Sequence, residues 1–501
     1  MSEMSRRDFI NRTAATVASV GLGVTAAGET LAGFSSGDVA PRTPDADVII
    51  IGGGLAGMAG AITAADDGAT VILIDKRYAI GGTAMGAGGS FSAAGTKMQQ
   101  AKNIQDSPEA HFRDADAIGK GKADPALLKL YTEHAPATMD WLMSLGIEFD
   151  PKGPRLAFEH ELYSVPRTYD ATGGGPGYIA VLRRQLMQRV DAGKVRLRTE
   201  TSARQLLADR GRIVGVRVVD DAGVPGTLHG KAVILACGGY GSNRAMLRRY
   251  NPTLAEAVTV ASKYATGDGI RMAEAAGAKL VNMDLLVPYF AGVENPPGSN
   301  RTMMISLLSG ILSAFKGDVW VAPDGKRFMN EDTPSPDERE RALRRLPNAH
   351  LFTIFDDAIL KANKPPLFNW DGLVQEGRVV KQARSIGALA IEIGVPPQAL
   401  VETIERYNGH VDSGRDADFG RKDLVRIQVP PFYGVVASGV IFMTAGGVQT
   451  NATLQAVDAR GHVIPGLYAA GEVMGAAQWM GDGLMGDAGN GDSSQHTEEK
   501  R

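Results

Sequence analysis

The stretch from Asp47 to Lys76 constrains the fold more than any other part of the sequence. It reads DVIIIGGGLAGMAGAITAADDGATVILIDK, in which two apolar runs flank a glycine turn and an alanine-rich segment. This order predicts a strand, a turn, a helix and a second strand that ends on an acid, as in a dinucleotide-binding βαβ unit. The turn lets a pyrophosphate approach the helix N-terminus, and the acid can accept hydrogen bonds from a ribose. The predicted nucleotide contacts are Gly52, Gly54, Leu55, Ala56, Gly57, Asp75 and Lys76.

The charge balance and the cysteine count exclude several classes of function. The 501 residues carry 53 Lys and Arg against 56 Asp and Glu, so no basic excess points to nucleic acid. Cys237 is the single cysteine, which excludes an intrachain disulfide, a C-x-x-C-H haem site and a four-cysteine iron-sulfur cluster. We expect Cys237 to be a small buried residue rather than a reactive thiol. Electrons must then enter or leave through an external donor or acceptor, and no metal site is predicted.

The first residues predict a targeting segment. Ser5 to Ile10 reads SRRDFI, a twin-arginine pattern, and a small-residue apolar run follows from Ala14 to Ala27. We therefore expect residues 1–34 to be a signal peptide read by the twin-arginine (Tat) translocon, followed by a linker over 35–45. The expected location is the periplasm or another exported compartment. This route carries folded proteins, so it suits a chain that must load its nucleotide before export.

Further glycine turns predict where the chain returns to the nucleotide. A run of small residues after Asp75 lets the backbone lie against a flat ligand, and a strand over 231–235 ends in a second glycine turn. A late strand ends on Gly471 and Glu472, whose carboxylate suits the hydroxyls of a flavin's ribityl chain. The additional candidate contacts are Gly82, Thr83, Gly95, Gly238, Gly239, Asp268, Gly471 and Glu472.

The composition of the sequence changes at about Asp284, after which prolines and charged residues are more frequent. We interpret residues 284–431 as an inserted capping domain that contributes to substrate binding. The nucleotide-binding domain then comprises residues 46–283 and 432–490, and 491–501 form a polar tail. This division predicts an α/β fold with a Rossmann-like domain built from both ends of the chain and an α+β insertion between them.

These residues resemble the flavoprotein family of fumarate reductases and succinate dehydrogenases. The soluble single-chain branch, with 3-ketosteroid dehydrogenases and urocanate reductases as relatives, is the most similar. The resemblance rests on ordered blocks, which are the first glycine turn, 81–83, 236–243, 265–278, 325–331, 407–408 and 465–472. It implies FAD held by the first and last segments, with a cap over the isoalloxazine. No histidine lies near Ala84, so we expect the FAD to be non-covalent.

The departures from the family pattern predict the substrate class. In the family an arginine acts as the general acid, and its position falls on Ser335 of this sequence. The family's His-His-Thr segment falls on Phe442, Met443 and Thr444, and its Thr-Glu pair falls near residues 312–313. The arginine that follows falls near Lys316, and 476–486 contain no arginine. A dicarboxylate would lack the charges that offset its burial, so a neutral or apolar substrate is favoured over fumarate. The expected pocket residues are Ser335, Phe442, Met443, Thr444, Trp479 and Gly481.

The sequence does not identify the residue that transfers the proton. Steroid dehydrogenases of the superfamily have a late Tyr-x-Gly-x-Gly that resembles residues 479–483, with Trp479 in place of the tyrosine. Indole is neither acid nor base at neutral pH, so the candidates become Tyr169, Tyr289 and Arg339. The leading hypothesis is hydride transfer between flavin N5 and an activated C=C or CH–CH bond next to a carbonyl. The alternatives are a flavin oxidase of the same fold and a catalytically impaired FAD-binding or electron-transfer protein, the latter because the tail lacks the family's apolar helix.

Overall fold

A parallel sheet forms the centre of the fold in the computed structural model, which describes residues 43–157, 160–294, 299, 301–303, 316–363 and 370–475. Its strands run in the order β18-β19-β8-β1-β2-β5, and only the edge strand β18 is antiparallel to its neighbour. The register places Val48 opposite Val71 and Ile51 opposite Leu235. The strands are β1 (Ala46–Ile51), β2 (Val71–Ile74), β5 (Val195–Arg198), β8 (Pro225–Leu235), β18 (Gln455–Val457) and β19 (Val463–Ala469).

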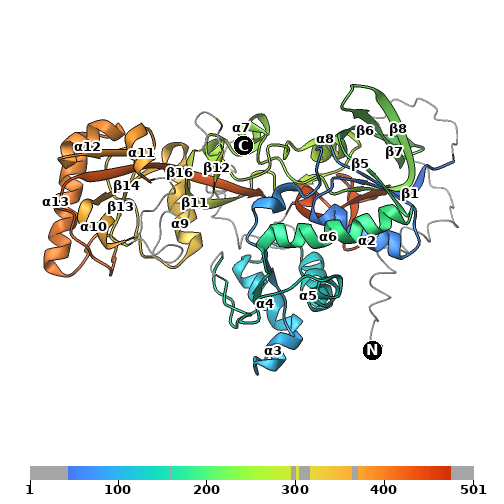
Figure 1. The fold of residues 1–501 in the computed structure, drawn as a ribbon, viewed down its shortest axis with the longest axis horizontal. Coiled ribbons are helices and arrows are strands. Elements are labelled where there is room, and N and C mark those ends of the chain that lie inside the picture. The colour runs from blue at the N-terminus through green and yellow to red at the C-terminus, as the bar shows by residue number, and fades with distance from the viewer. Residues whose placement is uncertain are drawn as a thin grey trace, which may run out of the picture.

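The composition of these strands explains their central position. All four residues of β2 are buried, as are five of the six in β1, because helices cover a parallel sheet on its faces and both sets of side chains need to be apolar. Helix α2 (Leu55–Asp66) provides the crossover from β1 to β2 and packs beside α6 (Gly174–Asp191) (Figure 1). Two further strands, β6 (Thr201–Asp209) and β7 (Arg212–Asp220), extend β8 as an antiparallel meander.

A second sheet has β16 (Phe432–Thr444) as its central strand. The first half of β16 pairs with β14 and β15, and its second half pairs with β11 and β9. In Figure 1 this strand runs from the group of helices α10–α13 toward the parallel sheet. The other strands are β9 (Val258–Thr259), β11 (Leu286–Glu294), β12 (Thr302–Met303), β13 (Val319–Val321), β14 (His350–Asp356) and β15 (Val380–Ala383).

Helices surround the two sheets. Those of the first part of the chain are α3 (Lys97–Ala101), α4 (Pro108–Ile118), α5 (Pro125–Leu145), α7 (Arg244–Tyr250) and α8 (Asp268–Ala275). Those of the insertion are α9 (Pro336–Arg344), α10 (Asp357–Ala362), α11 (Trp370–Glu376), α12 (Ile386–Ile393) and α13 (Pro397–Ser413). Helices α3 to α5, which we call the helical lobe, project from the parallel sheet in Figure 1. The antiparallel pair β3 (Ser90–Ser92) and β4 (Thr168–Asp170) flanks these helices in the sequence.

The apolar spacing over residues 124–146 and 399–411 predicts two helices, and the structure confirms them as α5 and α13. The Asp124 side chain accepts from two amides at the start of α5, and Gly146 ends that helix with φ 105°. The sequence predicts a strand over 440–444, and β16 is longer than this because residues 432–438 pair with β14 and β15. The domain boundaries remain a prediction, and the predicted signal peptide and polar tail lie outside the described residues. Among the described helices, none is both long and apolar enough to cross a membrane.

Candidate cofactor and active site

One cavity lies at the carboxyl ends of the parallel strands, where open α/β sheets bind ligands. Its walls come from the first glycine turn, the end of β2, the 81–84 turn, β6, the glycine turn after β8, α8 and the 470–472 turn. The lining residues that the sequence predicted are Gly52, Gly54, Leu55, Ala56, Asp75, Lys76, Gly82, Thr83, Gly238, Asp268, Gly471 and Glu472. Segments more than 400 residues apart in the chain therefore build one site.

The first glycine turn has the geometry of a phosphate cradle. A Cβ at Gly57 would lie 1.8 Å from the carbonyl oxygen of Gly52, and Gly52 itself has φ 112°. Gly54 caps α2 without a side-chain hydrogen bond, so the first amides of that helix are free to face an anion. Gly57 is not part of the cavity wall. It is needed because only a glycine permits this close approach of helix and strand.

Asp75 closes the nucleotide end of the cavity. Its Oδ2 accepts from the amide of Gly53 at 2.7 Å, and its Oδ1 accepts from the amide of Arg77 at 2.8 Å. Each carboxylate oxygen has a second lone pair, so both can still accept from ribose hydroxyls. Beside it, the Lys76 ammonium donates to Asp268 at 2.6 Å and to Thr266 at 2.7 Å. Desolvation raises the pKa of Asp268, but the Lys76 contact and its other hydrogen bonds lower it below its ordinary value.

Glu472 forms the opposite end. Its Oε1 accepts from the amide of Thr444 at 2.9 Å and from the Thr444 hydroxyl at 3.0 Å. Burial raises the pKa of Glu472 above its ordinary value, and these two bonds oppose that rise. Gly239 lies outside the cavity wall, but a Cβ there would be 1.9 Å from the Thr444 Oγ1 and 2.5 Å from Glu472 Oε1. Gly239 thus makes the space in which this carboxylate is held.

Cys237 also lines the cavity, which the sequence did not predict. Desolvation raises the pKa of its thiol to about 12, so it is a neutral thiol at physiological pH. The raised pKa agrees with the expected unreactive thiol, whereas Cys237 is half-buried rather than fully buried. Further lining residues that sequence reasoning missed include Arg77, Thr201, Ala203, Ser262, Tyr264 and Met272. Arg77 directly follows Lys76 and could have been included on that ground. The others carry no local signal, because they reach the cavity only through β6, α8 and the loop before α8.

Gly95 lies away from this cavity. Its amide donates to Gln99 Oε1 at 2.7 Å, and the next residue, Thr96, forms a capping box at the start of α3. The small-residue run therefore reaches the cavity at 81–84 and then enters the helical lobe. The positive φ of 76° at Gly95 explains the glycine there without a ligand.

The predicted catalytic residues lie in three different places. Tyr169 is fully buried in the helical lobe, where its hydroxyl contacts the Thr96 hydroxyl and burial raises its pKa to about 12. Arg339 is buried in α9, and its Nη1 donates to the carbonyl of Thr333 at 3.0 Å. The backbone of Tyr289 lies in β11 opposite Val440. Its side chain lies outside the described residues.

Four of the six predicted substrate-pocket residues lie among the described residues. Phe442 and Met443 are half-buried near the end of β16 and pack with Leu285 against Ala445. Thr444 is turned toward Glu472 instead, so its side chain belongs to the cofactor end of the site. Ser335 caps α9 by accepting from the Glu338 amide at 3.1 Å. Trp479 and Gly481 lie outside the described residues.

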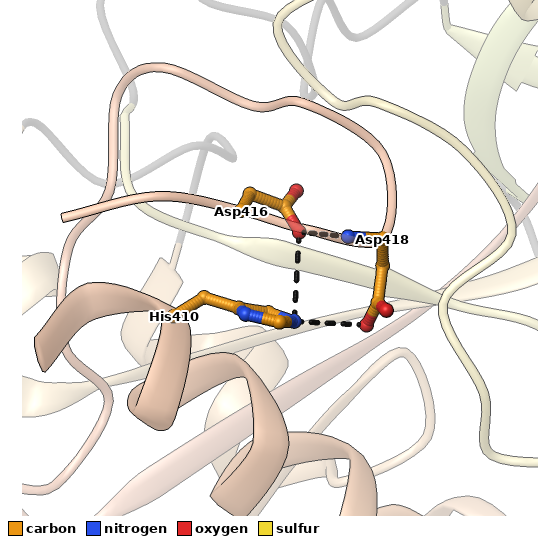
Figure 2. A group of neighbouring side chains, drawn as sticks. All are labelled: His410, Asp416 and Asp418. Atoms are coloured by element: carbon orange, nitrogen blue, oxygen red, sulfur yellow. Dashed lines mark hydrogen bonds and ion pairs between the residues drawn. The ribbon is translucent and has the colours of Figure 1, made fainter. Parts of the chain in front are cut away.

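A network of charged side chains occupies the insertion rather than the cavity. His410 Nε2 lies 2.9 Å from Asp418 Oδ2 and 3.7 Å from Asp416 Oδ1 (Figure 2). These three groups are close enough to share a cation, yet both carboxylates are already engaged. Asp416 accepts from Arg327, and Asp418 accepts from Arg406.

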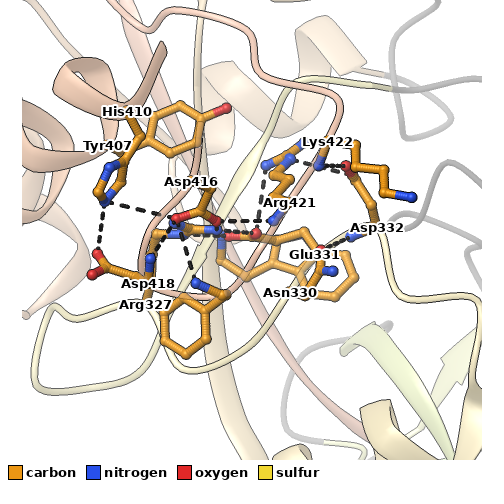
Figure 3. Close-up of polar contacts among 12 residues, drawn as sticks. Arg327, Asn330, Glu331, Asp332, Tyr407, His410, Asp416, Asp418, Arg421 and Lys422 are labelled. Carbon is orange, nitrogen blue, oxygen red and sulfur yellow. Dashed lines mark hydrogen bonds and ion pairs between the residues drawn. The ribbon is translucent and has the colours of Figure 1, made fainter. Parts of the chain in front are cut away.

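Arg327 connects this group to the 325–331 block on which the family resemblance rests. Its guanidinium reaches Glu331 Oε2 at 2.6 Å and Asp416 Oδ2 at 2.9 Å, and all three side chains are buried (Figure 3). Arg421 contacts the same Glu331 and also Asp332. Contacts with two acids further raise the already high pKa of Arg327. This motif therefore ties the loop after α13 to the strands of the insertion, and its role is structural.

The cavity fits a flavin dinucleotide. It offers a cradle in which a Cβ at Gly52 or Gly57 would collide with backbone, an acid at each end, and a buried Arg77 Nε with no acceptor among the described residues. Such an orphaned donor beside a cavity indicates that a ligand atom completes its bonding. The fold and the cavity thus define a dinucleotide-binding protein with a second sheet built around β16.

Comparison with known proteins gives the family. The chain matches the family described as FAD binding domain over residues 47–486. It is 33% identical over 434 residues to a fumarate reductase (cytochrome) of Shewanella frigidimarina, with 86% of this chain and 72% of that protein covered. It is 31% identical to a urocanate reductase of Eggerthella lenta, with 86% and 70% covered.

The solved structure of 3-ketosteroid delta1-dehydrogenase from Sterolibacterium denitrificans, in complex with 1,4-androstadiene-3,17-dione, supports the fold. It has a TM-score of 0.75 at 22% identity, with 88% of this chain and 96% of that chain covered. The chain belongs to the FAD binding domain family, its cofactor is FAD, and it is an FAD-dependent oxidoreductase of the class that acts on CH–CH bonds. The predicted fold class and family resemblance are confirmed.

Proposed function

We propose that this protein reduces or desaturates a carbon–carbon bond next to a carbonyl in a largely uncharged substrate. When bound, FAD supplies hydride transfer at N5. The observation that carries the proposal is the loss of charged groups at the positions where the family resemblance places a dicarboxylate clamp. The reductase relatives named above act on carboxylates, so the difference would lie in the pocket rather than in the cofactor.

Ser335 illustrates this loss. Its hydroxyl accepts from the Glu338 amide at 3.1 Å and also contacts the Glu161 carboxylate. Both contacts are to protein groups, so this hydroxyl serves the start of α9 and the junction with residues 160–167. It carries no charge with which to hold a carboxylate.

Lys316 is a second example of the loss of charged groups at the clamp positions. It falls near the position of a second clamp arginine, but its side chain is 57% exposed and pairs with Asp423 at 3.4 Å on the surface. Phe442 and Met443 add apolar area where the resemblance expects histidines. Burying a dicarboxylate against such walls would leave its charges without partners, at a cost of several kcal/mol per ion by a rough estimate. A neutral enone or ketone has no such penalty.

Arg339 is the proton carrier or carbonyl-polarising group that we favour. It lies one helical turn after Ser335 in α9, and its side chain is buried, with Nη1 donating to the carbonyl of Thr333 at 3.0 Å. Tyr169 is less suited, because its hydroxyl is enclosed in the helical lobe and its pKa is raised to about 12. Tyr289 lies on the strand adjacent to β16, so its backbone position is compatible with the pocket.

Anaerobic reoxidation of the reduced protein tests the substrate class. The flavin of the purified holoenzyme is reduced under argon, and its absorbance is followed after adding a cyclic enone, an acyclic enone, acrylate, urocanate or fumarate. We expect a neutral enone to reoxidise it faster than fumarate. Faster reoxidation by fumarate would overturn the neutral-substrate proposal. Reoxidation by oxygen alone, with stoichiometric peroxide, would identify an oxidase instead.

Export and non-covalent FAD complete the proposal. The twin-arginine pattern at residues 5–10 supports passage through the Tat translocon to the periplasm. The cavity lining contains no histidine among the described residues, which supports a dissociable flavin. An external donor or acceptor would then exchange electrons with the bound cofactor.

A further inference from the structure

We infer that Tyr264, together with Arg77, forms the wall against which the adenine of the cofactor packs. This inference rests on the FAD assignment and is independent of the proposed substrate. Tyr264 lines the cavity and is half-buried, so part of its ring faces the open space. The aromatic content of the chain is low at 6%, so a tyrosine at this cavity wall is a distinctive feature.

The adenosine end of the cavity is identified by its neighbours. Asp75 ends the second strand of the βαβ unit, which is where a ribose carboxylate lies, and Lys76 and Arg77 follow it directly. The Tyr264 ring centroid lies 5.3 Å from the Arg77 guanidinium carbon and 6.0 Å from the Lys76 ammonium. The opposite end is identified by Glu472 and Thr444. Tyr264 therefore belongs to the adenosine end.

The position of the ring is set by its own backbone and by fixed neighbours. The Tyr264 carbonyl accepts from the Thr266 amide at 2.9 Å, and its amide donates to Ser262 Oγ at 3.4 Å. Ser262 is in turn tied to the 81–84 turn, because its amide donates to Thr83 Oγ1 at 3.3 Å. Lys76 cannot swing across the ring freely, since Asp268 and Thr266 hold its ammonium.

The remaining walls at this end suit a flat, neutral base. Ala203 and Met272 line the cavity and carry no charge, and α8 contacts β6 there. The Arg77 Nε is buried without an acceptor among the described residues, so a nitrogen or oxygen of the nucleotide can complete its bonding. The Arg77 guanidinium lies over the Tyr264 ring, and the guanidinium together with the exposed part of the phenol provides stacking surfaces that adenine occupies well.

Flavin and ADP binding to the full-length chain tests this inference. Base-aromatic stacking contributes about 1–3 kcal/mol per base, so Tyr264→Ala should weaken FAD binding by roughly 5- to 150-fold. The affinity for ADP, which contains only the adenosine end of FAD, should fall by the same factor. It is measured by competition against FAD binding, which is followed by the quenching of flavin fluorescence. Tyr264→Phe keeps the ring and should stay within about twofold of the unmodified chain.

Thr444→Val is the matched control for the other end of the cavity. It should weaken FAD while leaving the affinity for ADP unchanged, because ADP lacks the ribityl chain. An unchanged FAD affinity in Tyr264→Ala, or a loss confined to FAD with ADP unaffected, would overturn the inference. So would a failure of ADP to compete for the unmodified chain. Circular dichroism of the flavin-free variants distinguishes lost stacking from lost folding, and failure of the substrate assay above would leave these binding results intact.

Discussion

Replacement of Thr444 by valine should destabilise the FAD-binding domain in a pH-dependent way. Valine has nearly the same shape as threonine, so no cavity forms, but the hydroxyl that donates to Glu472 at 3.0 Å is lost. The Tyr240 amide, which donates to that hydroxyl oxygen at 3.2 Å, also loses its acceptor. One charge-assisted hydrogen bond and one unsatisfied buried amide together amount to about 2.5–6 kcal/mol.

The direction of the pH effect follows from Glu472. Its folded pKa is raised above the ordinary value of 4.5, so the native state retains a proton that the unfolded state loses as the pH rises. Stability therefore falls with rising pH between 4.5 and the folded pKa. The Thr444 hydroxyl favours the ionised carboxyl and lowers that pKa. Removing the hydroxyl therefore raises the folded pKa of Glu472 and widens the pH range over which stability falls. The valine variant should lose more stability at about pH 8 than at about pH 5.

Urea titration of the FAD-loaded protein measures this effect, with the appearance of free-flavin fluorescence as the probe of the parallel-sheet domain. The titration is made at both pH values and at one FAD concentration, because bound ligand adds to apparent stability. Thr444→Ser keeps the hydroxyl and should show no increase in its penalty with pH. An equal penalty for Thr444→Val at both pH values, or a larger one at low pH, would refute the assignment of Glu472 as its partner.

Three further outcomes are expected. Gly57→Ala should abolish FAD retention, because its Cβ would lie 1.8 Å from a backbone oxygen, whereas Gly60→Ala in the same helix meets only an ordinary contact at 3.6 Å and should retain FAD in the purified protein. Arg327→Ala should cost about 3–5 kcal/mol by leaving buried acids unpaired, while Arg406→Ala on the exposed side should leave the urea midpoint followed by tryptophan fluorescence unchanged. Replacing Arg6–Arg7 by two lysines should trap the protein in the cytoplasmic fraction, and normal export of that variant would exclude the Tat route.

The sequence by itself determined the βαβ unit and most of the cofactor contacts. Their signals are local, because the alternation of apolar runs with glycines spaced for a tight turn admits few other structures. Gly57 and Asp75 could be assigned from spacing alone, since each role depends on residues fewer than 30 positions away. The late strand that ends on Glu472 suggested a flavin, and the family resemblance implied that the cofactor is FAD.

Only the tertiary structure decided which side chains complete the site. Thr444 was expected in the substrate pocket but reaches Glu472 from the end of β16, because the pairing of β16 with the cap strands sets its orientation. Gly95 has the composition of a ligand-facing glycine and instead enters the helical lobe. Tyr264 lies beside Arg77 although the two are 187 positions apart, and no periodicity or motif encodes a contact of that length. Such contacts follow from how the sheet, its crossovers and the loop before α8 pack together.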